Sequence, residues 1–195
     1  ALHATADDDP ALLEEVSALV EWPVAIVASF EDDFLSVPAE ALVLTMKKNQ
    51  KYFPLFDQDQ RLINRFITIA NIDSTQPELI RSGNERVIRP RLADAKFFWD
   101  KDIRQPLGER RAALDRLVFQ HKLGSIGDKT QRIEQLSALI AEQVGGDPAK
   151  AARAALLSRC DLVSEMVLEF PEMQGIMGRY LATQEDLKDI RFFSQ

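Results

Sequence analysis

The fold is decided by residues 52–70, which have the sequence YFPLFDQDQRLINRFITIA. Two runs rich in aromatic and β-branched residues, 52–56 and 61–70, lie on either side of the polar segment 57–60. Runs of this kind, separated by a few polar residues, are typical of an antiparallel β-hairpin. The sequence therefore predicts a hairpin in the N-terminal half of the chain.

Helices and one further strand are predicted on both sides of this hairpin. Asp9 followed by Pro10 is typical of a helix start, and the apolar run VAIVASF at 24–30 is typical of a buried strand. After the hairpin, Gly83 and Pro90 are expected to divide the chain into two helices. The predicted elements are a strand over 24–30 and helices over 7–22, 36–49, 77–81 and 89–101.

From Pro106 onward the strand patterns disappear, and only helices are predicted. The pair Gly145 and Gly146, followed by Asp147 and Pro148, marks one helix end and the next helix start. The predicted helices cover 107–119, 128–144, 148–168 and 171–183. The fold class is thus α+β, with a mixed α/β domain over residues 1–105 and an all-helical domain over residues 106–195.

The composition limits the classes of protein that the chain can belong to. Its single cysteine, Cys160, excludes an internal disulfide, and with only His3 and His121 beside it no zinc-finger ligand set is possible. A lone cysteine fits the reducing cytoplasm, where we expect the protein to be. Its longest apolar runs are too short to cross a bilayer, so no membrane partner is expected. The net charge of −7 argues against a general nucleic-acid binder, and DNA is not an expected partner.

A local cluster of basic residues nevertheless lies downstream of the hairpin. Arginine forks match the geometry of phosphate, and phosphate contacts position an RNA without reading its sequence. The candidates for such contacts are Arg86, Arg89, Arg91 and Lys96. The alternative is a set of structural ion pairs on the same helix, because three- and four-residue spacings join these cations to acidic residues. The acidic residues concerned are Glu85, Asp94, Asp100 and Asp102.

A second basic set precedes the hairpin and consists of Lys47, Lys48 and Lys51. Next to Tyr52 and Phe53, these lysines could bind a single RNA strand, with a base stacked on an aromatic ring. The alternative is a solvated helix end whose lysines complement the helix dipole, with Phe53 in the core.

Several stretches, taken together and in order, resemble one known family, the beta subunit of the bacterial two-subunit glycyl-tRNA synthetase. They are EWPVAIVASF at 21–30, MKKNQKYFP at 46–54, GNERVIRPRLADAKFF at 83–98, VFQHKLGS at 118–125, CDLVSEMV at 160–167 and FPEMQGIMGRY at 170–180. The resemblance covers most of residues 14–181, and residues 181–195 are not expected to follow the family pattern.

The resemblance implies a division of labour between two subunits. In that family the alpha subunit activates glycine with ATP and Mg²⁺, whereas the beta subunit recognises and positions the tRNA, with its anticodon-binding part near the C-terminus. This chain would then be an internal piece of the beta subunit, with no catalytic residues, metal site or cofactor of its own. Its partners would be glycine tRNA and the alpha subunit. Its mixed half would be similar to part of the editing-type domain of phenylalanyl-tRNA synthetase, and its helical half to an HD domain.

Two other functions remain open at this point. An HD-type phosphohydrolase needs a histidine, an adjacent His-Asp pair and a further aspartate to hold a metal. In this chain Cys160 and Asp161 occupy the place of the pair, and His121 alone cannot complete the set. The remaining alternative is a purely structural scaffold domain.

Overall fold

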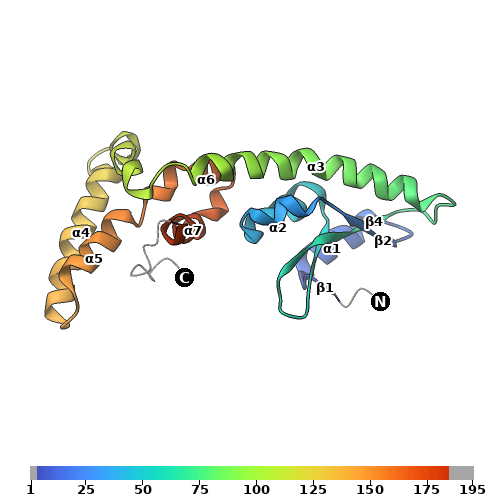
Figure 1. Cartoon of the computed structure of the whole chain (residues 1–195), viewed down its shortest axis with the longest axis horizontal. Coiled ribbons are helices and arrows are strands. Elements are labelled where there is room, and N and C mark those ends of the chain that lie inside the picture. Colours follow the sequence, from blue (N-terminus) through green and yellow to red (C-terminus); the bar gives the residue numbers. More distant parts are fainter. Residues whose placement is uncertain (1–3, 185–195) are drawn as a thin grey trace. The chain divides into compact units, whose positions relative to one another are not determined.

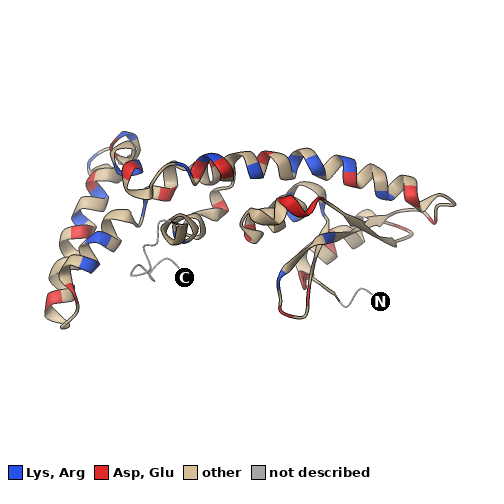
Figure 2. Cartoon of the chain, viewed as in Figure 1, with Lys and Arg blue, Asp and Glu red and all other residues tan. Residues whose placement is uncertain are grey.

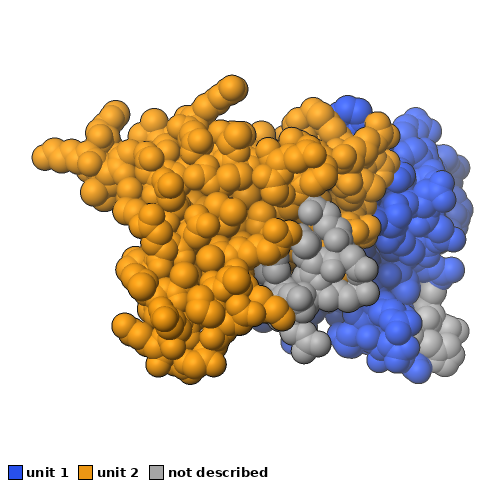
Figure 3. Space-filling view, turned by 60° about the vertical axis from the view of Figure 1, so that its left-hand side comes forward, with its two compact units in different colours: residues 1–97 blue, residues 98–195 orange. Residues whose placement is uncertain are grey.

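The computed structural model describes residues 4–184, so His3 and the segment from residue 185 to the end lie outside the described residues. The chain divides into two compact units, residues 1–97 and 98–195, which Figure 3 colours separately. The two sequence-based domains, 1–105 and 106–195, remain a prediction. In the described part of the chain, no helix is long and apolar enough to cross a membrane.

The first unit contains the predicted hairpin inside a four-stranded antiparallel sheet (Figure 1). The hairpin strands are β3 (Phe53–Phe56) and β4 (Leu62–Ala70), and the predicted strand at 24–30 is β2 (Val24–Ser29). A short strand that was not predicted, β1 (Thr5–Ala6), completes the order β1-β3-β4-β2. One edge of the sheet is therefore β2, which pairs only with β4.

Both faces of this sheet are covered, because alternate residues of β4 meet different helices. On one face Ile67 and Ile69 pack with Leu12 and Val16 of α1 (Pro10–Leu19). The Asp9 carboxylate begins α1 by accepting a hydrogen bond from the Leu12 N–H at 3.0 Å, as predicted.

On the other face Phe66 is fully buried and stacks on Tyr52, with 4.6 Å between the ring centroids. The Tyr52 hydroxyl donates to Asn84 Oδ1 at 2.6 Å, which ties the next helix, α3 (Pro77–Asp102), to this face. Burial raises the pKa of Tyr52 to about 12. The helix that precedes β3, α2 (Ala39–Gln50), buries Leu42 and Met46 completely.

The segment after the hairpin forms one helix, α3 (Pro77–Asp102), and the prediction of two helices was wrong. Pro90 lacks the N–H that would bond to the carbonyl one turn earlier, which costs helix stability. The helix continues because Ile88, Leu92 and Ala95, which follow helical spacing, are fully buried. Tertiary packing of an apolar face contributes more to a helix than local propensity does, so α3 passes through Gly83 and Pro90 without a break.

The second unit is mostly helical, but it contains a two-stranded hairpin that contradicts the all-helical prediction. Its strands are β5 (Val118–Gln120) and β6 (Gly124–Ser125). Gly124 has a φ of 87°, a left-handed conformation that glycine adopts without strain and that lets the chain reverse. The Ser125 side chain then caps α4 (Ile126–Gln143) in a reciprocal capping box with Asp128.

Three of the four helices predicted in this unit, over 107–119, 148–168 and 171–183, are shorter than expected, and the first of them is a 3-10 helix. The helix predicted over 128–144 forms as α4 with nearly the predicted bounds. α4 and α5 (Pro148–Leu157) form an antiparallel pair (Figure 1), joined at the predicted Gly-Gly-Asp-Pro boundary. The prediction of one helix over 148–168 was wrong, because the Ser164 hydroxyl accepts a hydrogen bond from the Val167 N–H and starts a new helix. The remaining elements are η2 (Leu107–Arg116), η3 (Cys160–Val163), α6 (Glu165–Glu169), η4 (Pro171–Met173) and α7 (Ile176–Gln184). The α+β class is confirmed.

Candidate functional site

Polar side chains of α3 bind the free edge of β2. The Arg81 Nε donates to the Val27 carbonyl at 2.9 Å. One helical turn further on, Glu85 Oε1 accepts from both the backbone N–H and the hydroxyl of Ser29, each at 2.9 Å. An edge strand exposes unpaired backbone groups, and these two side chains satisfy two of them. Arg81 and Glu85 thus hold α3 along the sheet.

Two members of the predicted basic cluster extend this series of contacts. The Arg89 Nε donates to Glu31 Oε1 at 2.6 Å, and the Lys96 ammonium lies 3.4 Å from the Ser36 hydroxyl. The pKa of Glu31 is lowered by its own backbone N–H and by Arg89. These contacts favour a structural role for Arg89 and Lys96, although the pairs are partly exposed and each contributes little to stability.

The other two members, Arg86 and Arg91, are exposed and form no ion pair with any described residue. The expected pair between Arg91 and Asp94 is not formed there. The two arginines are five residues apart on α3, and each residue turns a helix by about 100°, so they lie about 140° apart around its axis. They do not form one patch, and Figure 2 shows acidic and basic residues interleaved along α3.

The second basic set lies at the C-terminal end of α2, where Lys47 and Lys51 form ion pairs. Lys47 pairs with Asp7 at 2.7 Å and also with Asp9, and Lys51 pairs with Glu15 at 2.8 Å. Partial burial lowers the pKa of Lys47, but its hydrogen bonds to the two aspartates outweigh that effect and raise it. Lys48 is exposed.

Neither aromatic residue beside these lysines presents its ring to solvent. Tyr52 is 4% exposed and Phe53 is 7% exposed, so both belong to the core. Stacking on a base requires an accessible ring face. The arrangement therefore favours the structural alternative for this set, and contact of its lysines with RNA stays a prediction.

A cavity that sequence reasoning missed lies beside the β2 edge. It has a volume of about 330 Å³ and is lined by Val27, Ala28, Ser29, Arg65, Arg81 and Glu85. Arg65 lies on β4 directly opposite Ser29, whereas Glu85 is separated from Ser29 by 56 positions in the chain. No local sequence pattern could have predicted that these residues lie together. The one hint of a site in the sequence was the charged Arg65 within a largely apolar strand.

In the second unit, the two residues considered as metal ligands of an HD-type hydrolase, Asp161 and His121, lie in different surroundings. Asp161 is 1% exposed, and its Oδ2 accepts hydrogen bonds from the Gly175 N–H at 2.6 Å and the Gly178 N–H at 3.1 Å. Burial raises the pKa of the Asp161 carboxyl, although these N–H groups oppose the shift. His121 is exposed in the turn between β5 and β6. Among the described residues, no group of three His, Cys, Asp or Glu side chains could hold a metal ion.

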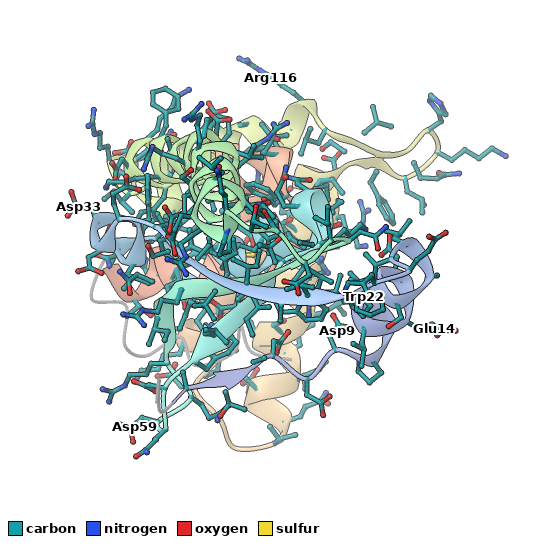
Figure 4. All side chains as sticks on the ribbon, turned by 90° about the vertical axis from the view of Figure 1, so that its right-hand side faces the viewer. Asp9, Glu14, Trp22, Asp33, Asp59 and Arg116 are labelled. Carbon is teal, nitrogen blue, oxygen red and sulfur yellow. The ribbon has the colours of Figure 1, made fainter. Side chains whose placement is uncertain are left out.

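Four of the residues labelled in Figure 4 are exposed and lie in turns or at the ends of elements. Asp59 lies at the tip of the β3–β4 turn, and Asp33 lies on η1 (Asp32–Ser36). Trp22 is 66% exposed in the segment between α1 and β2. Arg116 lies exposed at the end of η2, next to the β5–β6 hairpin.

Comparison with known proteins gives a consistent result over almost the whole chain. Residues 1–190 match the family described as "Glycyl-tRNA synthetase beta subunit", so the expectation that residues 181–195 depart from the family was wrong as far as residue 190. The glycine–tRNA ligase beta subunit of Chromohalobacter salexigens is 58% identical over 183 residues, which are 94% of this chain and 27% of that protein. The one from Pseudomonas fluorescens strain SBW25 is 56% identical over 187 residues, 96% of this chain and 27% of that protein. The chain thus spans about a quarter of the length of these curated relatives.

Proposed function

Since this chain belongs to the glycyl-tRNA synthetase beta subunit family, we propose that it is a non-catalytic part of a glycine–tRNA ligase that helps to bind and position glycine tRNA. A separate alpha subunit would activate glycine with ATP and Mg²⁺, and the beta subunit would hold the tRNA for transfer of the glycyl group. Both the tRNA and the alpha subunit are partners in this proposal.

The observation that carries the proposal is the pair of exposed arginines on α3. Arg86 and Arg91 form no ion pair with any described residue, so their guanidinium groups can bind phosphate without first breaking a salt bridge. Each phosphate contact releases condensed counterions, and an overall charge of −7 does not prevent such local contacts. Because phosphate contacts fix register and not sequence, this part of the protein would position the tRNA.

For the two units, we propose domain relationships that follow from the family. The helix-covered antiparallel sheet supports a relationship of the first unit to an editing-type domain. The Cys160-Asp161 pair within a largely helical second unit supports descent from an HD domain that has lost its metal ligands. The Asp161 carboxylate would then have kept a structural role, as a cap for the backbone N–H groups of Gly175 and Gly178. A hydrolase function is not favoured, because this carboxylate is buried while His121 is exposed.

The test uses the two-subunit enzyme with Arg86→Ala, Arg91→Ala and the double substitution. A matched control is Arg61→Ala, since the Arg61 side chain is 78% exposed in the β3–β4 turn. We expect each α3 substitution to weaken tRNA binding and to lower the slope of log Kd against log salt by about one. Glycine activation measured without tRNA should not change, because in this proposal glycine and ATP bind to the alpha subunit.

Two results would contradict the proposal. If the double variant binds tRNA with the affinity and salt slope of Arg61→Ala, α3 makes no phosphate contact. If glycine activation falls together with tRNA binding, Arg86 and Arg91 support the assembly of the enzyme, and the chain acts as a scaffold.

A further inference from the structure

The cavity beside the β2 edge has two chemically different walls. One wall is the sheet, where Arg65 of β4 lies directly opposite Ser29 of β2. The other is α3, where Arg81 and Glu85 bind the β2 backbone. Directly opposed residues in an antiparallel pair have side chains on the same face, with Cβ atoms about 5 Å apart. The cavity therefore combines arginine, serine and carboxylate groups in a space of about 330 Å³.

The two arginines of the cavity differ in how they are held. Arg81 donates from Nε to the Val27 carbonyl and from Nη1 to Glu78 at 2.6 Å, so it serves the attachment of α3. Arg65 is exposed and forms no hydrogen bond or ion pair from its side chain to any described residue. A guanidinium has five donors in a planar fork, which suits an oxyanion such as phosphate. The cavity thus offers one unengaged cation.

Glu85 offers the complementary group. Both hydrogen bonds from Ser29 end on its Oε1, and Oε2 accepts no hydrogen bond from the described residues. A carboxylate only accepts hydrogen bonds, so Oε2 is suited to a hydroxyl donor of a ligand. A ligand that fits must therefore carry an anionic group for Arg65 and a neutral hydroxyl for Glu85.

We propose that this cavity binds one ribonucleotide of the tRNA, with its phosphate on Arg65 and its ribose 2′-hydroxyl on Glu85. The proposal rests on the tRNA-binding function above and adds a specific subsite to it. A free phosphate would satisfy Arg65 but would place a second anion beside Glu85. Deoxyribose lacks the hydroxyl that Glu85 would accept, so the subsite distinguishes RNA from DNA. The volume lies at the lower end of the range for small-molecule sites, which suits a single nucleotide.

Two substitutions test the two halves of the subsite in the complete two-subunit enzyme. Arg65→Ala removes the phosphate contact, and Arg61→Ala, four residues earlier on the same hairpin, is the matched control. Glu85→Gln keeps an oxygen that can accept from Ser29 and replaces only the unengaged oxygen by an NH2 group. Arg65→Lys keeps the charge without the fork and should give an intermediate result. Urea unfolding of each variant checks that the fold is retained.

The first readout is the affinity for glycine tRNA as a function of salt. Arg65→Ala should weaken binding roughly tenfold and lower the salt slope by about one, because it removes one charged hydrogen-bonded contact. The second readout is interference by single 2′-deoxy substitutions distributed over the tRNA. One position that interferes with binding to the wild-type enzyme should stop interfering with Glu85→Gln, while the other positions keep their effects.

The subsite is refuted if Arg65→Ala binds tRNA like Arg61→Ala, or if Glu85→Gln gives the wild-type interference pattern. In that case a loss of binding in Arg86→Ala and Arg91→Ala would leave the proposed function standing without this subsite. If none of these variants affects binding, both proposals fail together.

Discussion

Substitution of Asp102 by alanine is expected to destabilise the second unit severely, because its buried carboxylate accepts hydrogen bonds from three donors at once. Asp102 is 1% exposed, and its Oδ1 accepts from Arg110 Nη1 at 3.1 Å and from the Glu165 N–H at 3.0 Å. Its Oδ2 accepts from the Met166 N–H at 2.9 Å. Arg110 is itself 3% exposed. One carboxylate thus neutralises a buried guanidinium and caps the start of α6.

The magnitude follows from these contacts. Removing one partner of a buried ion pair costs about 3–5 kcal/mol, because the remaining charge stays buried without compensation. Losing the cap of a helix costs about 1 kcal/mol more, but the two terms share the same oxygen atoms and do not add fully. We expect Asp102→Ala to lower the free energy of unfolding by about 4 kcal/mol. Arg110→Ala should cost less, about 2 kcal/mol, because Asp102 keeps two backbone N–H donors and the unsatisfied Nε of Arg110 is removed.

Urea unfolding followed by tryptophan fluorescence measures this effect. Trp99 is 5% exposed in the second unit and Trp22 is 66% exposed in the first, so a Trp22→Phe background reports on Trp99 alone. With an m-value of about 2 kcal/mol/M, the midpoint should fall by roughly 2 M for Asp102→Ala. Lys101→Ala is the control, because its ion pair with Glu165 is exposed and contributes at most about 1 kcal/mol. The proposed role of Asp102 is refuted if the urea midpoint of Asp102→Ala resembles that of Lys101→Ala, or if Arg110→Ala lowers the midpoint more than Asp102→Ala does.

Two further predictions concern glycine and a buried carboxyl. Gly83→Ala should stabilise the protein by about 0.5–1 kcal/mol, since its helical position is open and an added Cβ meets nothing within 4 Å. Gly124→Ala should destabilise the protein by about 1–2 kcal/mol, because a residue with a Cβ is strained at a φ of 87° and the added Cβ would also approach the Asp128 carboxylate. Equal urea midpoints for Gly83→Ala and Gly124→Ala would contradict this contrast. Burial raises the pKa of Asp161 above its ordinary value of 3.8, so the carboxyl binds its proton more tightly in the folded than in the unfolded state. The wild type should therefore lose stability relative to Asp161→Asn as the pH rises from about 4 through the raised pKa. If the difference in urea midpoint between the two proteins stays constant across that range, the pKa of the Asp161 carboxyl is not raised.

Much of the fold could be predicted because its signals are local. The hairpin at 52–70 has the composition of its strands within a single continuous segment. Asp9 and Asp147 each stand before a proline, and each accepts hydrogen bonds from backbone N–H groups at the start of its helix. Caps and turns of this kind involve neighbours within three residues, so the sequence displays both partners together.

The features that could not be predicted depend on residues far apart in the chain. Pro90 and Gly83 locally disfavour a helix, and only the burial of Ile88 and Leu92 shows why α3 continues through them. The cavity brings Ser29 together with Arg65 and Glu85, which are 36 and 56 positions away. Seven basic residues were predicted to contact RNA. Three of them, Lys47, Lys51 and Arg89, form ion pairs with acidic residues that lie 36 to 58 positions away in the chain. Charge and spacing alone do not identify such partners.

We propose that this chain contributes directly to tRNA binding. The most direct measurement is a titration of the chain with glycine tRNA and with an unrelated tRNA, at low and at moderate salt. We expect binding that weakens as salt rises and that favours glycine tRNA. Absence of binding to either tRNA at low salt would contradict it, and the chain would then be a scaffold without RNA contacts of its own.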